Sequence, residues 1–276
     1  MLNEVKFVEK YSVLMSLYWK EKPEYLVTAI DSMLNQTVKP DEIVIVEDGP
    51  LTEELYNVLD GYGERIKRIK NEKNLGLGLA LNIGLKHCRN ELVARMDTDD
   101  ISKVDRCEKQ LLYMEMHKDV AIVGGQIQEF VGKVGNIRGK RVVPCDDIEI
   151  KKFMKKRCPF NHMTVFFRKS EIIDVGSYQD WFYNEDYYLW IRLALKNTKF
   201  ANLSDVLVDV RTSEDMYQRR GGKLYFESEK KIQLYLKKNK IISWSRYIIN
   251  ISERFFLQVL FPNKMRKMIF EVFARK

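Results

Sequence analysis

The chain has 276 residues, of which 45% are hydrophobic and 12% aromatic, so it can bury a substantial core and is neither a disordered nor a collagen-like chain. It opens on mixed charges, and no stretch approaches the roughly 18 apolar residues of a spanning helix, so we expect neither a secretion signal nor a membrane-spanning helix. The net charge of +8 is uneven, because Arg211 to the C-terminus holds 16 Lys/Arg and 6 Asp/Glu, a net +10 that leaves −2 for residues 1–210.

The first hundred residues alternate strand and helix patterns. Apolar or β-branched runs predict strands at 12–17, 42–46, 65–70 and 92–96, and helical spacing predicts helices at 23–34, 52–59 and 77–87. This alternation is typical of an α/β domain with a largely parallel sheet, in which ligands bind beyond the carboxyl ends of the strands. Tyr18, Asp48 and Asp97 follow three of the predicted strands, so we expect their side chains to converge at one edge.

Beyond residue 100 the pattern continues less regularly. It predicts a helix at 104–116, a strand at 121–128, a glycine-rich basic hairpin at 133–140, a helix at 148–157, a strand at 165–167 and a helix at 185–195. The last helix carries Glu185 and Asp186 in its first turn, where acidic side chains complement the helix dipole.

The stretch Asp97-Thr98-Asp99-Asp100 carries the clearest chemical signal. Three carboxylates this close repel one another unless a cation lies among them. Mg²⁺ and Mn²⁺ prefer such hard oxygen ligands, with substrate phosphates completing the shell. The alternative is an acidic turn in which Asp100 or Ser102 caps a helix that starts near Lys103. These residues alone leave both interpretations open.

Five motifs, in the order of the predicted elements, resemble those of the family 2 glycosyltransferases. They are Tyr11 to Tyr18 with Ser32 to Thr37, Ile45 to Gly49, Asn74 to Gly76, Asp97 to Asp99, and Asn184 to Trp190. The resemblance implies a GT-A fold over residues 1–220, with a mixed, largely parallel sheet flanked by helices. It further implies a nucleotide-sugar half at 1–105, an acceptor half at 106–220, a UDP-sugar donor and a Mn²⁺ or Mg²⁺ cofactor.

The same resemblance assigns roles to single residues. It implies a nucleotide-sugar site formed by Ser16, Tyr18, Asp48, Asn74, Gly76, Arg95 and Asp97. In that site Asp48 would accept a hydrogen bond from uracil, Asp97 would face the ribose or the metal, and Asp99 would bind the metal directly. Glu47 stands where the family often has aspartate, which leaves its role open.

The resemblance also implies a catalytic base in the motif that begins at Asn184. A hydroxyl nucleophile needs a base within hydrogen-bond reach. Asp186 fits that role by its place in the motif, with Glu185 as the second candidate, whereas the structural alternative is dipole complementarity alone. A single base opposite the leaving group implies inversion of configuration.

Two further segments resemble a bacterial subgroup that makes surface polysaccharides such as capsule, O-antigen or exopolysaccharide. His162 lies in one of them, either at the acceptor mouth or in a structural role, and Arg219 and Arg220 lie in the other. Paired arginines clamp diphosphate oxygens, although a solvated basic loop explains them equally well. The subgroup implies a donor of UDP-galactose or UDP-glucose and an undecaprenyl-diphosphate-linked sugar acceptor.

Residues 221–276 are expected to form a basic, amphipathic helical tail. Ile248, Ile251, Phe255 and Val259 recur at helical spacing, and a second apolar stripe follows Pro262. Such a stripe either packs on the catalytic domain or lies in a membrane interface. The basic flanks favour an anionic membrane surface, so we expect a cytoplasmic enzyme at the inner face of the cytoplasmic membrane.

Two other classes of protein compete with this interpretation. A nucleotidyltransferase would usually have a glycine-rich basic loop after the first strand, whereas residues 18–22 contain no glycine. A nucleic-acid-binding protein should have a basic face throughout, whereas residues 1–210 carry a net −2. We therefore expect an enzyme with no nucleic-acid partner.

Overall fold

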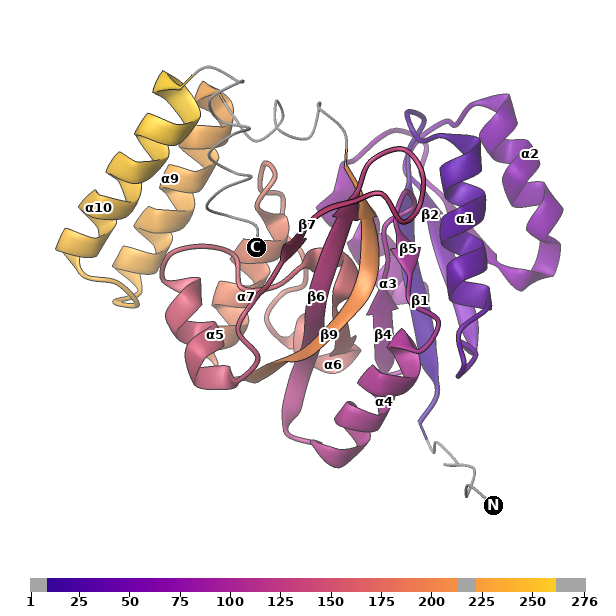
Figure 1. Ribbon diagram of the computed structural model, residues 1–276, viewed down its shortest axis with the longest axis horizontal. Coiled ribbons are helices and arrows are strands. Elements are labelled where there is room, and N and C mark those ends of the chain that lie inside the picture. Colours follow the sequence, from indigo (N-terminus) through magenta and orange to yellow (C-terminus); the bar gives the residue numbers. More distant parts are fainter. Residues whose placement is uncertain (1–8, 213–221, 262–276) are drawn as a thin grey trace.

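The computed structural model describes residues 9–212 and 222–261, which form one mixed sheet covered by helices on both faces (Figure 1). The strands are β1 (Tyr11–Leu17), β2 (Glu42–Glu47), β3 (Lys67–Lys70), β4 (Leu92–Arg95), β5 (Ile101–Ser102), β6 (Val120–Phe130), β7 (Ile137–Arg141), β8 (Phe166–Arg168) and β9 (Lys199–Arg211). The helices are α1 (Pro23–Leu34), α2 (Glu53–Tyr62), α3 (Leu77–His87), α4 (Arg106–Met116), α5 (Asp147–Met154), α6 (Lys169–Asp174), α7 (Glu185–Leu195), α9 (Lys223–Lys238) and α10 (Trp244–Phe255).

The strands follow the order β3-β2-β1-β4-β8-β6-β9-β5, and β7 pairs with β6 outside this path. The first four are mutually parallel, β8 is antiparallel to both β4 and β6, and β9 is parallel to β6. Strands β4 and β6 therefore run the same way. The carboxyl ends of β1, β2, β4, β6 and β9 consequently face one edge of the sheet.

Two apolar layers hold the helices against the sheet. Side chains of α1, α2 and α4 pack on one face, and side chains of α3, α5, α6, α7 and α9 pack on the other. Helix α3 lies especially close, since a Cβ atom on Gly84 would stand 2.4 Å from Leu14 Cδ1 and 2.6 Å from Val46 Cγ2. This close approach brings the N-terminus of α3 to the edge where β1 and β2 end.

The structure confirms most of the predicted elements. Helices α1, α3 and α7 have the predicted bounds, and the basic hairpin turns between β6 and β7 through Gly132 and Gly135, both at positive φ. Strand β9 was not predicted. Asn202, Ser204 and Asp205 interrupt its apolar residues, so the sequence lacks the strict alternation of a strand. The pairing of β9 with β6 also shifts register, as at a β-bulge.

The predicted cap on the helix after the acidic stretch is wrong. Helix α4 begins only at Arg106, and Ile101 and Ser102 instead form β5, which pairs with β9. The Asp100 carboxylate accepts the backbone N–H of Arg211 at 2.9 Å. Residues 101 and 102 therefore pair with β9 as the short strand β5, and the helix begins only after them.

The described part of the chain ends in an antiparallel helix pair, α9 and α10, at one side of the molecule (Figure 1). Ile232 and Leu236 of α9 are fully buried in the core layer that they share with α7, and the Tyr188 and Tyr235 rings lie 4.9 Å apart. Helix α10 continues as a π-helical turn, Phe256–Leu260. None of the helices described is both long and apolar enough to cross a membrane. Arg219, Arg220 and the apolar stripe after Pro262 lie outside the described residues.

Candidate active site

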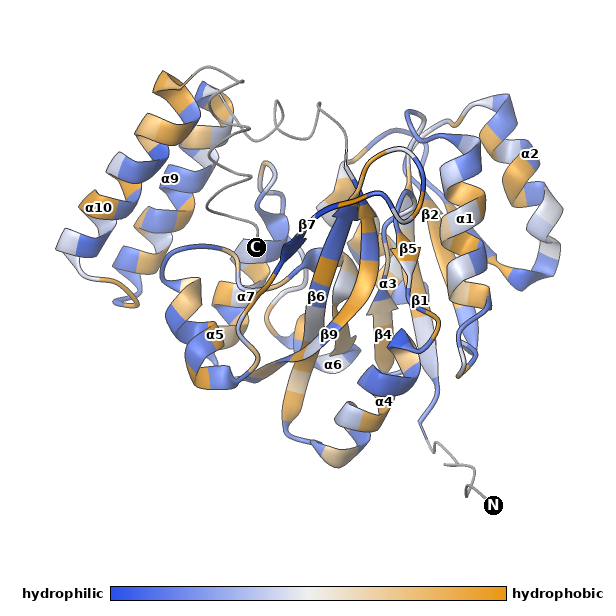
Figure 2. Ribbon diagram, in the orientation of Figure 1, coloured by the Kyte–Doolittle hydropathy of each residue, from blue (hydrophilic) through white to orange (hydrophobic). Residues whose placement is uncertain are grey.

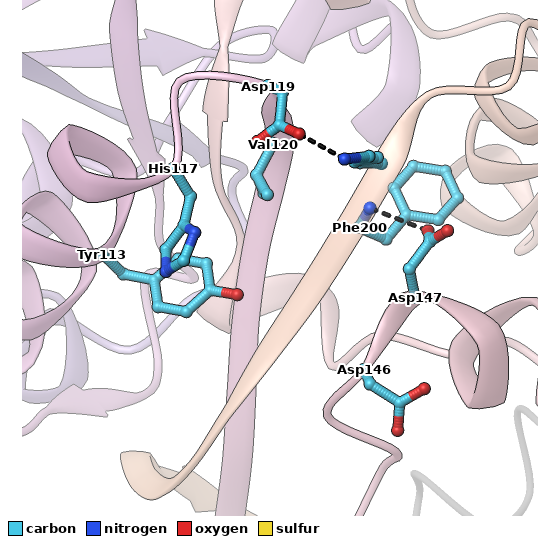
Figure 3. A pocket seen from close by; sticks show the side chains of 8 residues that line it. Tyr113, His117, Asp119, Val120, Asp146, Asp147 and Phe200 are labelled. Atoms are coloured by element: carbon cyan, nitrogen blue, oxygen red, sulfur yellow. Dashed lines mark hydrogen bonds and ion pairs between the residues drawn. The ribbon is translucent and has the colours of Figure 1, made fainter.

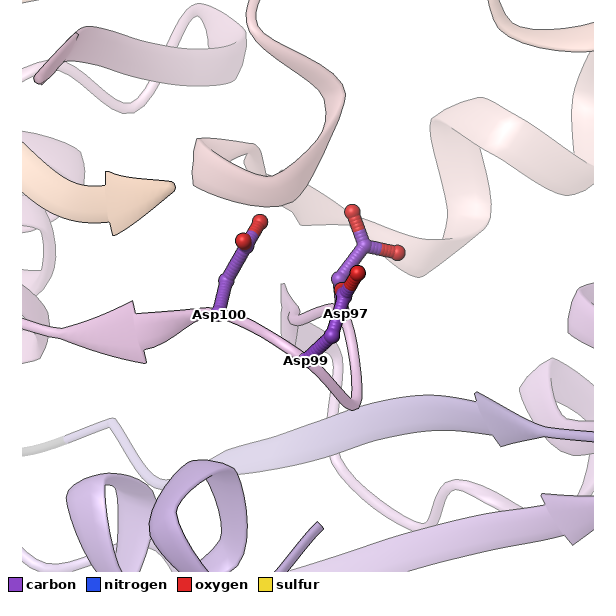
Figure 4. A group of neighbouring side chains, drawn as sticks. All are labelled: Asp97, Asp99 and Asp100. Atoms are coloured by element: carbon purple, nitrogen blue, oxygen red, sulfur yellow. The ribbon is translucent and has the colours of Figure 1, made fainter. Parts of the chain in front are cut away.

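The acidic loop after β4 gathers three carboxylates (Figure 4). Oxygens of Asp97, Asp99 and Asp100 all lie within 4.8 Å of one another, and the three side chains point to the same side of the loop. Burial, followed by the charges of Asp97 and Glu21, raises the pKa of Asp99 to about 7. Burial and the neighbouring aspartates also raise the pKa of Asp100 well above its ordinary value. A divalent cation would relieve this repulsion, and its preferred ligands are the oxygens present.

Arg211, at the end of β9, fixes the acidic loop from the opposite side. Its Nε donates to the carbonyl of Asp99 at 3.2 Å, and its backbone N–H donates to Asp100. The guanidinium lies 3.7 Å from the ring centroid of Tyr25 and 4.7 Å from that of Phe130, which holds its plane. Sequence reasoning missed Arg211, because Asp99 and Asp100 lie more than a hundred residues away from it in the chain.

Arg95 is the buried cation of the site. Its Nη2 pairs with Asp97 Oδ1, whereas Nε and Nη1 are buried without a hydrogen-bond partner among the described residues. Its positive charge opposes the rise in the pKa of Asp99 and of Glu185, so it lies within electrostatic reach of both acidic groups. Unpaired guanidinium N–H groups bind phosphate oxygens well, which suits the predicted place of Arg95 in a nucleotide-sugar site. Behind it, the buried Arg106 donates to the Arg95 carbonyl at 2.8 Å.

Asp48 organises the loop that leads into α3. Its buried carboxylate accepts the N–H groups of Leu75 and Gly76, each at 2.9 Å, and the Asn71 amide at 3.1 Å. Asn74 donates to the Asp48 carbonyl at 3.1 Å. Gly76, at φ +86°, turns the chain into the helix, as a residue with a Cβ rarely can. The structure thus brings Asp48, Asn74 and Gly76 together at the end of β2, as predicted.

Glu47, one residue earlier, carries an unused acceptor. Its Oε1 accepts from Arg68 Nε at 2.5 Å, whereas Oε2 is buried and has no hydrogen-bond partner among the described residues. A buried carboxylate oxygen without a partner is costly. Glu47 is therefore a further group that a ligand N–H at this edge could satisfy.

Ser16 and Tyr18 lie at the end of β1, as predicted, and Tyr18 is 36% exposed. In the loop that follows, Glu21 Oε2 accepts from the Thr98 hydroxyl at 3.1 Å. Burial raises the pKa of Glu21, and the charge of Asp97 adds to the rise. Sequence reasoning missed this additional carboxylate beside the acidic loop, because no pattern distinguishes it from a solvated glutamate.

The second acidic group, Glu185 and Asp186, begins α7. Asp186 Oδ1 accepts the Tyr187 N–H at 2.6 Å, and the Cys158 thiol donates to Oδ2 at 3.5 Å. Burial, then the charge of Asp186, raises the pKa of Glu185 to about 7, and burial also raises the pKa of Asp186. A Cβ atom on Gly78 of α3 would lie 3.2 Å from Glu185 Cβ. The start of α7 therefore meets the start of α3, beside the Asp48 loop.

His162 lies in the 3₁₀ turn His162–Thr164, where its Nε2 is 2.9 Å from the Tyr178 hydroxyl. Its ring also packs at an angle to the rings of Tyr178 and Trp190. Burial, and then the charge of Arg95, lowers the pKa of His162 well below its ordinary value. His162 is therefore a neutral ring that lies within electrostatic reach of Arg95.

A cavity of about 300 Å³ lies elsewhere, at the amino ends of β6 and β9 (Figure 3). Asp119 and Lys199 form an ion pair at its wall, and the Asp147 carboxylate accepts the Phe200 N–H at 3.0 Å. The strands run from this end toward the acidic loop. The cavity contains none of the predicted site residues and is separate from the candidate site.

A mixed α/β sheet with acidic loops at the carboxyl ends of its strands is the arrangement of the GT-A glycosyltransferases. The chain aligns with S. aureus TarS, residues 1–349 in complex with UDP-GlcNAc, with a TM-score of 0.64 over 96% of this chain and 76% of that one. At 18% identity this likeness establishes the fold alone.

The family follows from the sequence comparisons. Residues 12–180 match the model of glycosyl transferase family 2, and the chain belongs to that family. It is 47% identical to the amylovoran biosynthesis glycosyltransferase AmsE of Erwinia amylovora over 82% of this chain and 84% of that one. It is 40% identical to the UDP-Gal:alpha-D-GlcNAc-diphosphoundecaprenol beta-1,3-galactosyltransferase of Escherichia coli over 97% of each. The chain is therefore a hexosyltransferase of the bacterial polysaccharide subgroup.

Proposed function

We propose that this enzyme transfers a hexose from a UDP-sugar to a hydroxyl of a sugar carried on undecaprenyl diphosphate. The observation that carries the proposal is that two acidic groups, Asp97 to Asp100 and Glu185 to Asp186, both lie within electrostatic reach of the buried Arg95. The relative from Escherichia coli favours UDP-galactose over UDP-glucose as the donor. The two relatives also favour a role in surface-polysaccharide assembly.

The donor would lie along the ends of β1, β2 and β4. Ser16, Tyr18, Asn74 and Gly76 line this edge with Asp48. Its Oδ2 accepts only the Gly76 N–H and has room for a second hydrogen bond, here from the uracil N–H. The unpaired N–H groups of Arg95 would take diphosphate oxygens. In this proposal residues 1–105 supply the nucleotide site and residues 106–220 the acceptor site.

The acidic loop would hold Mn²⁺ or Mg²⁺ through Asp99, with Asp97 as a second ligand. A bound divalent cation stabilises negative charge on a departing diphosphate without proton transfer. Asp100 is the weaker candidate for a ligand, because its carboxylate already accepts the Arg211 N–H. Arg211 and Arg95 keep the loop in shape, whether or not a ligand is bound.

Asp186 would take the proton of the attacking hydroxyl. Hydrogen bonds from the Tyr187 N–H and the Cys158 thiol fix its carboxylate, so little reorganisation is needed during reaction. Glu185 beside it has its pKa raised to about 7 and can carry a proton, which limits repulsion between the two. Direct attack by the acceptor, with one base, gives inversion at the transferred sugar.

His162, Arg219 and Arg220 would contact the acceptor or a diphosphate. For His162 the support is its neutral ring within electrostatic reach of Arg95, whereas the two arginines rest on family resemblance alone. We further propose that the enzyme works at the inner face of the cytoplasmic membrane, where its acceptor resides, through the basic part at 221–276.

The experiment is a screen of UDP-sugars for UDP release, with synthetic GlcNAc- and GalNAc-diphosphate-lipid acceptors and with Mn²⁺ or EDTA. We expect release from UDP-galactose that requires both acceptor and metal. Asp99→Asn should lose Mn²⁺ binding and turnover, whereas Asp186→Asn should lose turnover but keep UDP and Mn²⁺ binding. Full activity of either variant on the identified substrates rejects the mechanism. Pyrophosphate release from UTP and a sugar phosphate would instead indicate a nucleotidyltransferase.

A further inference from the structure

Helix α10 and the π-turn after it have an inverted amphipathic orientation. Their polar side faces the protein, and their apolar side faces solvent. Asn250, Arg254 and Gln258, spaced four residues apart, face inward, and Asn250 and Gln258 are 1% and 8% exposed. The outward side, here called the apolar face of α10, comprises Trp244, Ile248, Ile249, Phe255, Phe256, Val259 and Leu260, each 38–59% exposed. Surface helices normally show the opposite pattern. In Figure 2 apolar colour follows α10 at the outer side of the molecule, beyond α9.

Specific buried bonds hold this orientation. Asn250 Nδ2 donates to Gln233 Oε1 at 2.7 Å and to the Lys155 carbonyl at 2.8 Å. Arg254 Nε pairs with Glu229 at 2.5 Å, and both side chains are about one-tenth exposed. Rotating the helix to hide its apolar face would break these bonds and leave buried polar groups without partners. The outward position of the apolar face is therefore built into the packing.

The charge around the apolar face is strongly positive. Residues 223–261 contain eight Lys/Arg and three Glu, and removing the buried Arg254–Glu229 pair leaves seven against two. Lys237 lies 3.6 Å from the centroid of the Trp244 ring, so a cation borders the apolar face directly. Aromatic and aliphatic side chains flanked by lysines are typical of helices that lie in an anionic lipid interface.

We propose that the apolar face of α10 inserts into the interface of an anionic membrane, with the helix axis along the surface. A second copy of the chain fits less well, because a symmetric pair through this face would bring two strongly positive surfaces together. The purpose of this contact, access to a lipid-linked acceptor, rests on the proposed function, whereas the contact itself rests on α10 alone.

The test is co-sedimentation of the full-length protein with vesicles of phosphatidylglycerol and phosphatidylethanolamine, compared with phosphatidylcholine vesicles. We expect binding to the anionic vesicles that weakens as salt rises. The double variant Ile248→Glu/Phe256→Glu should partition at least about tenfold more weakly, because it places two charges where exposed apolar side chains would enter the interface. Met116→Glu, an equally exposed apolar position on α4, is the matched control and should bind as the wild type does.

Activity separates this proposal from the proposed function. The double variant should keep wild-type turnover on a water-soluble, short-chain acceptor and lose it on an acceptor embedded in vesicles. If the wild type is active but does not bind anionic vesicles, or if the double variant binds as well as Met116→Glu, the membrane proposal is wrong. A wild-type dimer that the double variant dissociates, measured by analytical ultracentrifugation, would assign the face to a second copy instead. A wild type that binds vesicles but transfers no sugar would contradict only the proposed function.

Discussion

At the scale of single residues the site is defined by carboxylates whose pKa is raised first by burial and, at Asp99, Asp100 and Glu185, also by neighbouring carboxylates. Glu185 and Asp186 are the clearest pair, since burial raises the pKa of both and each adds to the charge near the other. A carboxylate must be ionised to act as a base. The pKa of about 7 at Glu185 therefore places proton binding by this pair within the working range of pH.

We expect kcat to fall at acid pH, approaching tenfold per pH unit, because burial raises the pKa of Asp186 and its protonation removes the base. The variant Glu185→Gln removes the neighbouring charge, so the pKa of Asp186 should fall and the acidic limb should move to lower pH. The measurement is the pH profile of kcat at saturating substrates. An inactive Glu185→Gln beside an active Asp186→Asn would make Glu185 the base.

The raised pKa of Glu185 also makes the stability of the fold depend on pH. Above about pH 7, Glu185 is ionised in both the folded and the unfolded chain. The buried charge then lowers the free energy of unfolding by its full amount. That cost declines as the pH falls toward the ordinary value of 4.5, where both states are protonated. Glu185→Gln should therefore raise Tm at pH 8 and leave it nearly unchanged at pH 4, as scanning calorimetry would show.

Arg211 acts on the acidic loop from the end of β9. Arg211→Gln should weaken Mn²⁺ binding by about tenfold to a hundredfold, because the Asp99 carbonyl loses its donor and the loop its stacked support. The binding is measured by the loss of free Mn²⁺ signal in electron paramagnetic resonance, with UDP present. Arg138→Gln, at an exposed arginine of β7, is the matched control. Equal Mn²⁺ affinity in the two variants would show that Arg211 does not support metal binding by the acidic loop.

Residues in motifs could be predicted from the sequence, whereas their supports could not. Asp48 belongs to one short motif and Asn74 and Gly76 to another, and the structure brings them together as expected. Glu21 and Arg211 contact the acidic loop only because β1 and β9 end beside it, which depends on the sheet order. Single-sequence patterns carry local periodicity and do not specify such distant pairings.

At the scale of elements, the position of α3 depends on a residue without a side chain. Gly84→Ala should destabilise the protein by about 1–3 kcal/mol, because its Cβ would overlap Leu14 and Val46 and force α3 from the sheet. Urea unfolding followed by circular dichroism measures the loss. Gly61→Ala in α2 is the matched control, since its Cβ meets nothing within 4 Å, and it should be neutral or slightly stabilising. Equal stability of the two variants would contradict the close approach of α3.

Helices and strands with regularly spaced apolar residues or strong start signals could be predicted. Strands that depend on pairing with distant segments could not. Helix α1 starts at Pro23 and α7 starts with two acids, both strong local signals. Strand β5 depends on its pairing with β9, more than a hundred residues later in the chain, and β9 pairs in turn with β6. The prediction that Asp100 caps a helix was wrong for the same reason. The Asp100 carboxylate instead accepts the backbone N–H of Arg211 at the end of β9.

At the scale of the whole molecule, one sheet joins the two proposed halves of the catalytic part. Residues 1–105 contribute β1 to β4 at one end of the sheet and β5 at the other, next to β9. Strand β4 pairs with β8 from the second half. The ranges 1–105 and 106–220 therefore share one sheet, which neither part completes without the other.

The helix pair is tied to the same core. Ile232 and Leu236 of α9 are buried in the layer that covers the sheet together with α3 and α7, and Asn184 donates to Ser228 Oγ at 3.1 Å just before the proposed base. We therefore expect residues 9–261 to unfold as one cooperative unit, although α10 alone turns an apolar face outward. In urea, tryptophan fluorescence and far-ultraviolet circular dichroism should give the same midpoint, since Trp19, Trp190 and Trp244 report from different parts of the chain. An earlier fluorescence transition would mean that α9 and α10 detach before the sheet opens. In that case α9 and α10 could change their position while the sheet stays folded.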